Sequence, residues 1–118
     1  VLFRSKGINK MQREAMLTQL GYAPNDALVK QLTNIVNNTK GYEKIQKHIM
    51  DLHNHLQVNN SYVALSNSSD YFKIKIESKT EELSQEAHEK VEHFSNKFKV
   101  EIKQLETKNT YYIIGFNH

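Results

Sequence analysis

The spacing of apolar residues changes near Asn60, and this change is the strongest constraint on the fold. Before it, apolar residues recur every three or four positions, as in Leu28, Leu32 and Ile35, which is the pattern of a helix with one buried face. After it, residues 71–77 alternate apolar and charged side chains, which is the pattern of a strand with one face in the core. The sequence therefore predicts helices first and strands afterwards.

Three helices are expected before the change. They cover residues 8–20, residues 26 to the polar break at 37–41, and residues 42–57. Gly21 is placed to end the first helix, and Asn25 or Asp26 to cap the second, because these residue types satisfy the free backbone groups at helix ends. The third helix has one apolar stripe, formed by Ile45, Ile49, Leu52 and Leu56.

Four strands and one further helix are expected after the change. The strands cover residues 62–66, 71–77, 99–106 and 110–117. Between the second and third strands, Ser78 and Glu81 form a capping-box pattern that starts a helix running to residue 97. Its inward stripe consists of Leu83, Ala87, Val91, Phe94 and Phe98.

The predicted fold class is α+β, with three N-terminal helices followed by a β-β-α-β-β unit that forms a four-stranded sheet. The first and last strands are apolar on both faces, whereas the second carries Lys73 and Lys75 and the third carries Glu101 and Lys103. Charged strands are typical of sheet edges, so the expected strand order is 2-1-4-3 in a mixed sheet. Strands that are buried on both sides need cover on both, so the N-terminal helices should cover the second face or one end. This order of elements is similar in topology to small regulatory and scaffold domains of the longin, roadblock and PAS types, a likeness that implies no function.

The net charge of +3 comes entirely from the first ten residues. Arg4, Lys6 and Lys10 supply it, and from residue 11 onward thirteen basic residues face thirteen acidic ones. The opening VLFRS resembles the translated read-through of a sequencing adapter. Residues 1–10 are therefore interpreted as a sequencing or assembly scar or a non-native extension. The single domain is then residues 11–118, with a helical part over 11–60 and the sheet with its helix over 61–118.

Several functional classes are not supported by the sequence. There is no cysteine, which excludes disulfides, thiolate zinc fingers and a cysteine nucleophile. No glycine-rich phosphate loop and no serine in a nucleophile-elbow context occurs. The longest apolar run covers only residues 111–114, far below the roughly 20 residues that span a bilayer. We therefore expect a cytoplasmic protein without membrane segments that is not an enzyme and carries no cofactor.

A histidine cluster on the third predicted helix is the sharpest local signal. His48, Asp51 and His55 stand at i, i+3 and i+7, on one flank of the helix beside its apolar stripe, and His53 lies on the other flank. Imidazole and carboxylate ligands suit zinc or another divalent transition metal. Against this reading, i to i+7 spans about 10 Å of helix rise, and the i, i+4 histidine pair of zincin helices is absent. The alternative interpretation is a solvated polar rim.

One strand face is considered as a binding site for nucleic acid. Tyr71, Lys73 and Lys75 combine an aromatic ring and two cations on one strand face, as in single-strand nucleic-acid binders, but acidic residues flank them and the signal is weak. Nucleic acid is therefore not the expected partner.

The leading expectation is a small, soluble, non-catalytic module for protein interaction, regulation or scaffolding, which binds a protein partner or itself. Its contact surface would be the edge strands or the first helix, with Met11, Met16 and Leu20. The alternatives are a metal or small-ligand binder that uses His48, Asp51 and His55, and a weak single-stranded nucleic-acid binder.

Overall fold

The computed structural model describes residues 10–106 and 109–117. Its elements are α1 (Lys10–Gln19), α2 (Asp26–Asn38), α3 (Tyr42–Leu56), the 3-10 turn η1 (Gln57–Asn59), β1 (Tyr62–Leu65), β2 (Phe72–Lys75), α4 (Glu81–Phe98), β3 (Val100–Gln104) and β4 (Thr110–Phe116). The α+β class and the change from helices to strands after Asn60 are confirmed. The extension predicted over residues 1–10 lies outside the described residues apart from Lys10, which begins α1.

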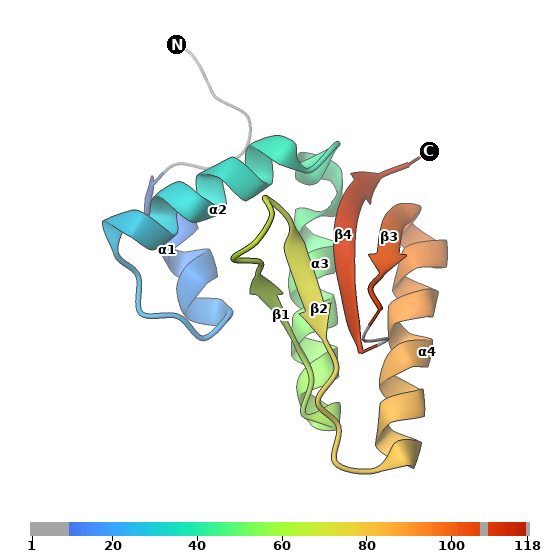
Figure 1. Cartoon of the computed structure of the whole chain (residues 1–118). Helices are drawn as coiled ribbons and strands as arrows, with labels where there is room; N and C mark the ends of the chain where they lie inside the picture. Colours follow the sequence, from blue (N-terminus) through green and yellow to red (C-terminus); the bar gives the residue numbers. More distant parts are fainter. Residues whose placement is uncertain (1–9, 107–108, 118) are drawn as a thin grey trace.

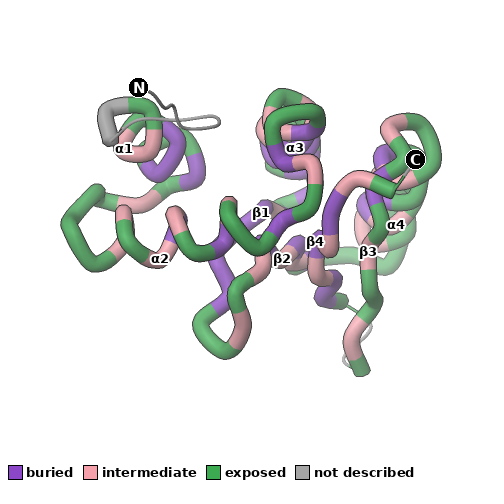
Figure 2. Tube along the Cα trace, turned by 90° about the horizontal axis from the view of Figure 1, so that it is seen from above, coloured by how far each residue is buried: buried purple, intermediate pink, exposed green. Residues whose placement is uncertain are grey.

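The two longest helices lie side by side on one face of a four-stranded sheet (Figures 1 and 2). α3 contacts β1 and β4, and α4 contacts β3. α2 lies at one end of the sheet, where Gln31 Nε2 donates to the Ser66 carbonyl (2.9 Å) and Asn38 Nδ2 donates to the Asp70 carbonyl (2.8 Å) in the β1–β2 turn. The opposite face of β2 and β4 is left open toward the viewer in Figure 1.

The predicted strand order is wrong. The sheet is ordered β1-β2-β4-β3 and not 2-1-4-3, and all three strand pairs are antiparallel, so the sheet is not mixed. β4 is central and β3 is an edge, as predicted, but β2 and β1 exchange places. β2 is central even though it carries Lys73 and Lys75, because both lysines point to the open face while Phe72 and Ile74 point into the core.

β1 occupies an edge because side chains bind its outward backbone N–H groups. Val63 N–H donates to His53 Nδ1 (3.0 Å), and Leu65 N–H donates to the Tyr22 hydroxyl (3.1 Å). α2 and α3 contact the same strand, so Val63, Ala64 and Leu65 are buried without a second neighbouring strand. Burial on both faces, which predicted a central strand, is here produced by helices. The N-terminal helices accordingly enclose this edge and the end of the sheet, and α3 joins α4 on a single face (Figure 2).

Two helix ends follow from local sequence. Gly21 ends α1 with φ +98°, and the bonds from Gly21 N–H to Thr18 and from Tyr22 N–H to Leu17 form a Schellman motif. Asn25 caps α2 by accepting from Leu28 N–H (2.8 Å), as predicted.

The predicted cap of the last helix is wrong by two residues. Thr80, and not Ser78, caps α4, since its Oγ1 accepts from Leu83 N–H (3.1 Å). Ser78 instead donates to the Asn59 carbonyl (2.6 Å), which joins the residues before α4 to the end of η1. A tertiary contact thus takes the side chain that the local pattern assigned to a cap.

The core lies between the sheet and the two long helices and extends under α1 and α2. Of the stripe predicted for α4, Ala87, Val91 and Phe94 are buried, while Leu83 and Phe98 are half-buried. The stripe of α3 is buried throughout. Across the described residues, no helix has both the length and the apolar character needed to cross a membrane.

His53 is a buried polar residue in this core, 1% exposed, although the sequence placed it only on a helix flank. Because Nδ1 accepts from Val63 N–H, the ring is the neutral form with its proton on Nε2, the nitrogen that lies 3.3 Å from Gln57 Nε2. Burial lowers the pKa of His53, and the bond to the Gln19 backbone opposes this shift. Protonation would place an N–H on Nδ1, directly against the Val63 N–H.

We expect the free energy of unfolding to fall as the pH drops below about 6.5, the ordinary histidine pKa. Above that pH neither state binds the proton; below it the unfolded chain takes up a proton that the folded chain resists, so the folded state loses stability. Urea unfolding at a series of pH values measures this slope. His53→Gln should reduce it, whereas His55→Gln, an exposed site on the same helix, should leave it in place. A slope unchanged in His53→Gln would show that His53 is not the group responsible.

Candidate functional site: the groove between α3 and α4

α3 and α4 lie antiparallel, and two contacts fix their register. Near one end the His48 ring stacks on the Phe98 ring, with centroids 3.6 Å apart and planes 10° apart. Near the other end Lys90 Nζ donates to the His55 carbonyl (3.2 Å) and to Asn59 Oδ1 (2.6 Å). These contacts hold the helices at a spacing that leaves a groove on the surface facing away from the sheet.

This groove has a volume of about 620 Å³. Its floor is apolar and consists of Leu52 from α3 and Phe94 and Phe98 from α4. Val58 of η1 lies at its edge with 74% of its surface exposed. Among the described residues, no other large hydrophobic side chain is exposed. An aliphatic side chain in this position adds apolar surface to the groove that water now covers.

Charged side chains rim the groove, and their signs differ between its ends. Glu86 and Glu89 line the end near the start of α4, whereas Lys97 lines the end near its finish. Asp51 lines the α3 side, and Lys90 lies at the same end as Glu86, since both side chains bond to Asn59. Lys90 is already bonded to groups of α3 and η1, and Lys97 Nζ lies 5.4 Å from the Phe98 ring centroid. The groove is thus acidic at one end and basic at the other.

The three predicted metal ligands, His48, Asp51 and His55, all line this groove. His48 stacks on Phe98, while Asp51 and His55 are exposed on the α3 rim. Among the residues that the structure describes, no three His, Cys, Asp or Glu side chains are grouped so that they could hold a metal ion. The spacing of two helical turns between the histidines explains this, because each ring reaches a different part of the groove.

Sequence reasoning missed the residues that give the groove its apolar character. Val58 continues the line of His48, Asp51 and His55 by a further three positions, and this periodicity is the signal that could have revealed it. The partners from α4, namely His93, Phe94 and Phe98, could not be found in this way, because they come from another element 35 to 50 positions away and only the packing of α3 on α4 brings them near.

The first helix is not an exposed contact surface, contrary to the expectation. Met16 and Leu20 are buried, with 3% and 7% exposure, and the Tyr42 hydroxyl lies 3.0 Å from the Met16 sulfur. The side chain of Met11 lies outside the described residues. α1 therefore uses Met16 and Leu20 to pack into the core, and they are not available to a partner.

The chain matches no protein-family model, no curated protein and no solved structure.

Proposed function

We propose that this chain is a non-catalytic protein-interaction domain and that two copies associate through the α3–α4 groove. The observation that carries the proposal is the apolar floor of the groove with exposed Val58 at its edge, set between ends of opposite charge. Apolar surface of this kind is stabilised when a partner covers it. The partner must also complement the charges of the rim.

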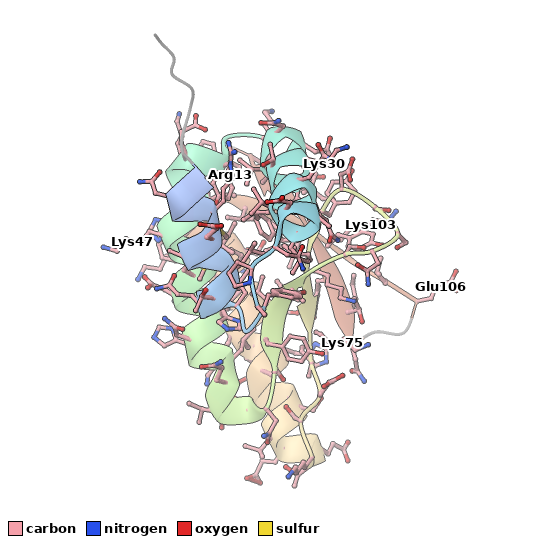
Figure 3. All side chains as sticks on the ribbon, turned by 90° about the vertical axis from the view of Figure 1, so that its left-hand side faces the viewer. Arg13, Lys30, Lys47, Lys75, Lys103 and Glu106 are labelled. Carbon is pink, nitrogen blue, oxygen red and sulfur yellow. The ribbon has the colours of Figure 1, made fainter. Side chains whose placement is uncertain are left out.

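A second copy of the chain meets this requirement. In a twofold-symmetric pair the same patch meets itself reversed, so the acidic end of one groove faces the basic end of the other. Glu86 and Glu89 of each copy would then lie near Lys97 of its partner. Lys47 projects from the outer side of α3 in Figure 3 and is not among the residues that line the groove. Val58 of each copy would cover apolar atoms in the groove of the other.

Charge reversal provides the test. Glu89→Lys and Lys97→Glu should each weaken association at least about tenfold, because each places like charges in contact across the pair. The double variant should restore association, since the two reversed groups meet again across the twofold axis. Sedimentation equilibrium over a range of protein concentrations measures the effect. Glu89 and Lys97 are exposed, so neither change should alter the fold.

Val58→Asp tests the apolar part of the contact and should abolish association. Ala27→Asp, an exposed substitution in the first turn of α2, is the matched control and should leave association intact. A monomer at all concentrations, or a double variant that associates no better than the single ones, would refute self-association through this groove.

A small apolar ligand is the second candidate occupant, and the groove's volume of about 620 Å³ favours it because small-molecule sites measure roughly 300–1,000 Å³. Native mass spectrometry of the unchelated protein separates the cases, since it reads the mass of the assembly and of anything bound. A bound organic molecule would support the ligand. Bound zinc that is lost in a His48→Ala variant would support the metal predicted for His48, Asp51 and His55.

A further inference from the structure

The open face of the sheet carries a row of side chains that crosses three strands. Strand register pairs Lys73 of β2 with Tyr112 of β4, and Tyr112 with Lys103 of β3. Tyr112 is half-buried and Lys103 is exposed, and strand alternation turns Tyr112 away from the core, because its neighbours Tyr111 and Ile113 are buried. An aromatic ring is therefore flanked on both sides by lysines, an arrangement that involves residues 39 positions apart.

A second ring extends this surface. Tyr71 precedes β2 and lies beside Tyr112, with ring centroids 5.2 Å apart and planes inclined by 31°. Tyr112 is held in place at its hydroxyl by Ser68 Oγ (3.1 Å) and Ser66 Oγ (3.4 Å) in the β1–β2 turn. Hydrogen bonds from Ser66, Ser68 and Ser69, together with the charge of Lys73, lower the pKa of Tyr112 to about 8. The ring is thus fixed by its hydroxyl end, and a cation lies close to it.

We propose that Tyr71 and Tyr112, with Lys73, Lys75 and Lys103 around them, bind single-stranded nucleic acid on this face. Bases would stack on the tyrosine rings and the lysines would contact phosphates, which is the way sequence-tolerant single-strand binders work. Strand alternation also places Lys75 on this face, two residues from Lys73. The surface lies on the other side of the sheet from the α3–α4 groove and does not depend on the proposed self-association.

Charge and shape select this occupant over others. Three lysines of the face stand against Glu101, which lies two residues from Lys103, while Asp70 and Glu77 lie beyond the two ends of β2. The strands themselves carry an excess of lysine, which Asp70 and Glu77 offset at the ends of β2, so binding should be weak and dependent on salt. A duplex cannot present unstacked bases to the rings. An acidic protein could use the lysines, but it has no planar bases to stack on two neighbouring aromatic rings.

Fluorescence anisotropy with labelled oligothymidylate and oligouridylate, compared with a blunt duplex, tests the proposal. The single strands should bind more tightly than the duplex. Affinity should fall with salt between about 50 and 200 mM, with a slope of log K against log salt of about −2 for three phosphate contacts. Lys103→Gln should reduce the size of that slope by about 0.7. Lys47→Gln, on the far side of the molecule, is the matched control and should change neither affinity nor slope.

The tyrosines provide the decisive variants. Tyr71→Ala should weaken binding about tenfold through the loss of one stacking platform. Tyr112→Phe keeps the ring and should retain most of the binding, whereas Tyr112→Leu should lose about as much as Tyr71→Ala. Circular dichroism shows whether each variant folds, and Tyr71, which precedes β2, gives a result even if Tyr112→Leu does not fold.

Three results would overturn the proposal. The first is equal binding of duplex and single strand, and the second is the absence of binding at low salt. The third is a loss confined to the lysine variants together with full competition by polyglutamate, which would identify the face as a docking surface for an acidic protein.

Discussion

Phe72→Ala is expected to lower the free energy of unfolding by about 3–5 kcal/mol, the usual cost of removing a buried phenylalanine side chain. Phe72 has no exposed surface and lies in β2 between Leu65 of β1 and Ile113 of β4. Its ring also stacks on Tyr42 of α3, with centroids 5.8 Å apart. The cavity would therefore open between two strands and a helix, where no single element can move to fill it. Urea unfolding measures the change.

Lys73→Ala is the matched control for this prediction. Lys73 is the next residue of the same strand and faces the open side, so its replacement should change stability by less than about 1 kcal/mol. Equal losses in the two variants would mean that the two faces of β2 have been assigned wrongly. An unchanged midpoint for Phe72→Ala would mean that β2 is not a central strand.

Gly115→Ala is expected to destabilise the fold by about 2–4 kcal/mol. Gly115 has φ +152° in β4, and a Cβ there would lie 2.7 Å from the Lys40 nitrogen and 2.8 Å from the Lys40 carbonyl oxygen. Backbone strain of this kind costs roughly 1–3 kcal/mol. The displaced Lys40 would also lose its hydrogen bond from Phe116 N–H (2.7 Å), a contribution of about 1 kcal/mol. Urea unfolding gives the energy, and hydrogen exchange at the Phe116 amide shows whether this contact opens.

Gly21→Ala separates strain from crowding. Gly21 has φ +98° but nothing lies within 4 Å of the position of its Cβ, so the substitution should cost about 1–2 kcal/mol, from backbone strain alone. Crowding against Lys40 then accounts for the difference between the two variants. If Gly115→Ala costs no more than Gly21→Ala, the close approach of the α2–α3 turn to β4 does not contribute to stability.

Helices and their faces were predictable because their signals are local. Four apolar residues of α3 at helical spacing were enough to identify its buried side, and the caps at Asn25 and Gly21 followed from side-chain and backbone chemistry within a few residues. Ser78 shows the limit of such signals. Its capping pattern was present, but the carbonyl of Asn59 was a competing partner that the local sequence did not reveal.

The strand order and the surfaces depended on contacts between distant elements. β1 was predicted to be central because it is apolar on both faces. In the structure it is an edge strand, because His53 and Tyr22 accept hydrogen bonds from its backbone N–H groups and helices cover its side chains. The sequence revealed only three polar residues of the groove, all on one helix, because most of the apolar floor comes from α4. Tyr112 and Lys103 were not associated with Lys73 because strand register, which pairs them, could not be known.

The sequence by itself determined which segments form helices and strands and which side of each faces the core, since a side chain's direction follows from the repeat of its own backbone. Only the tertiary structure decided which strands are neighbours, which helices share a face, and where apolar and charged side chains of different elements meet. Those outcomes depend on free energies summed over residues far apart in the chain, and no single segment carries that information.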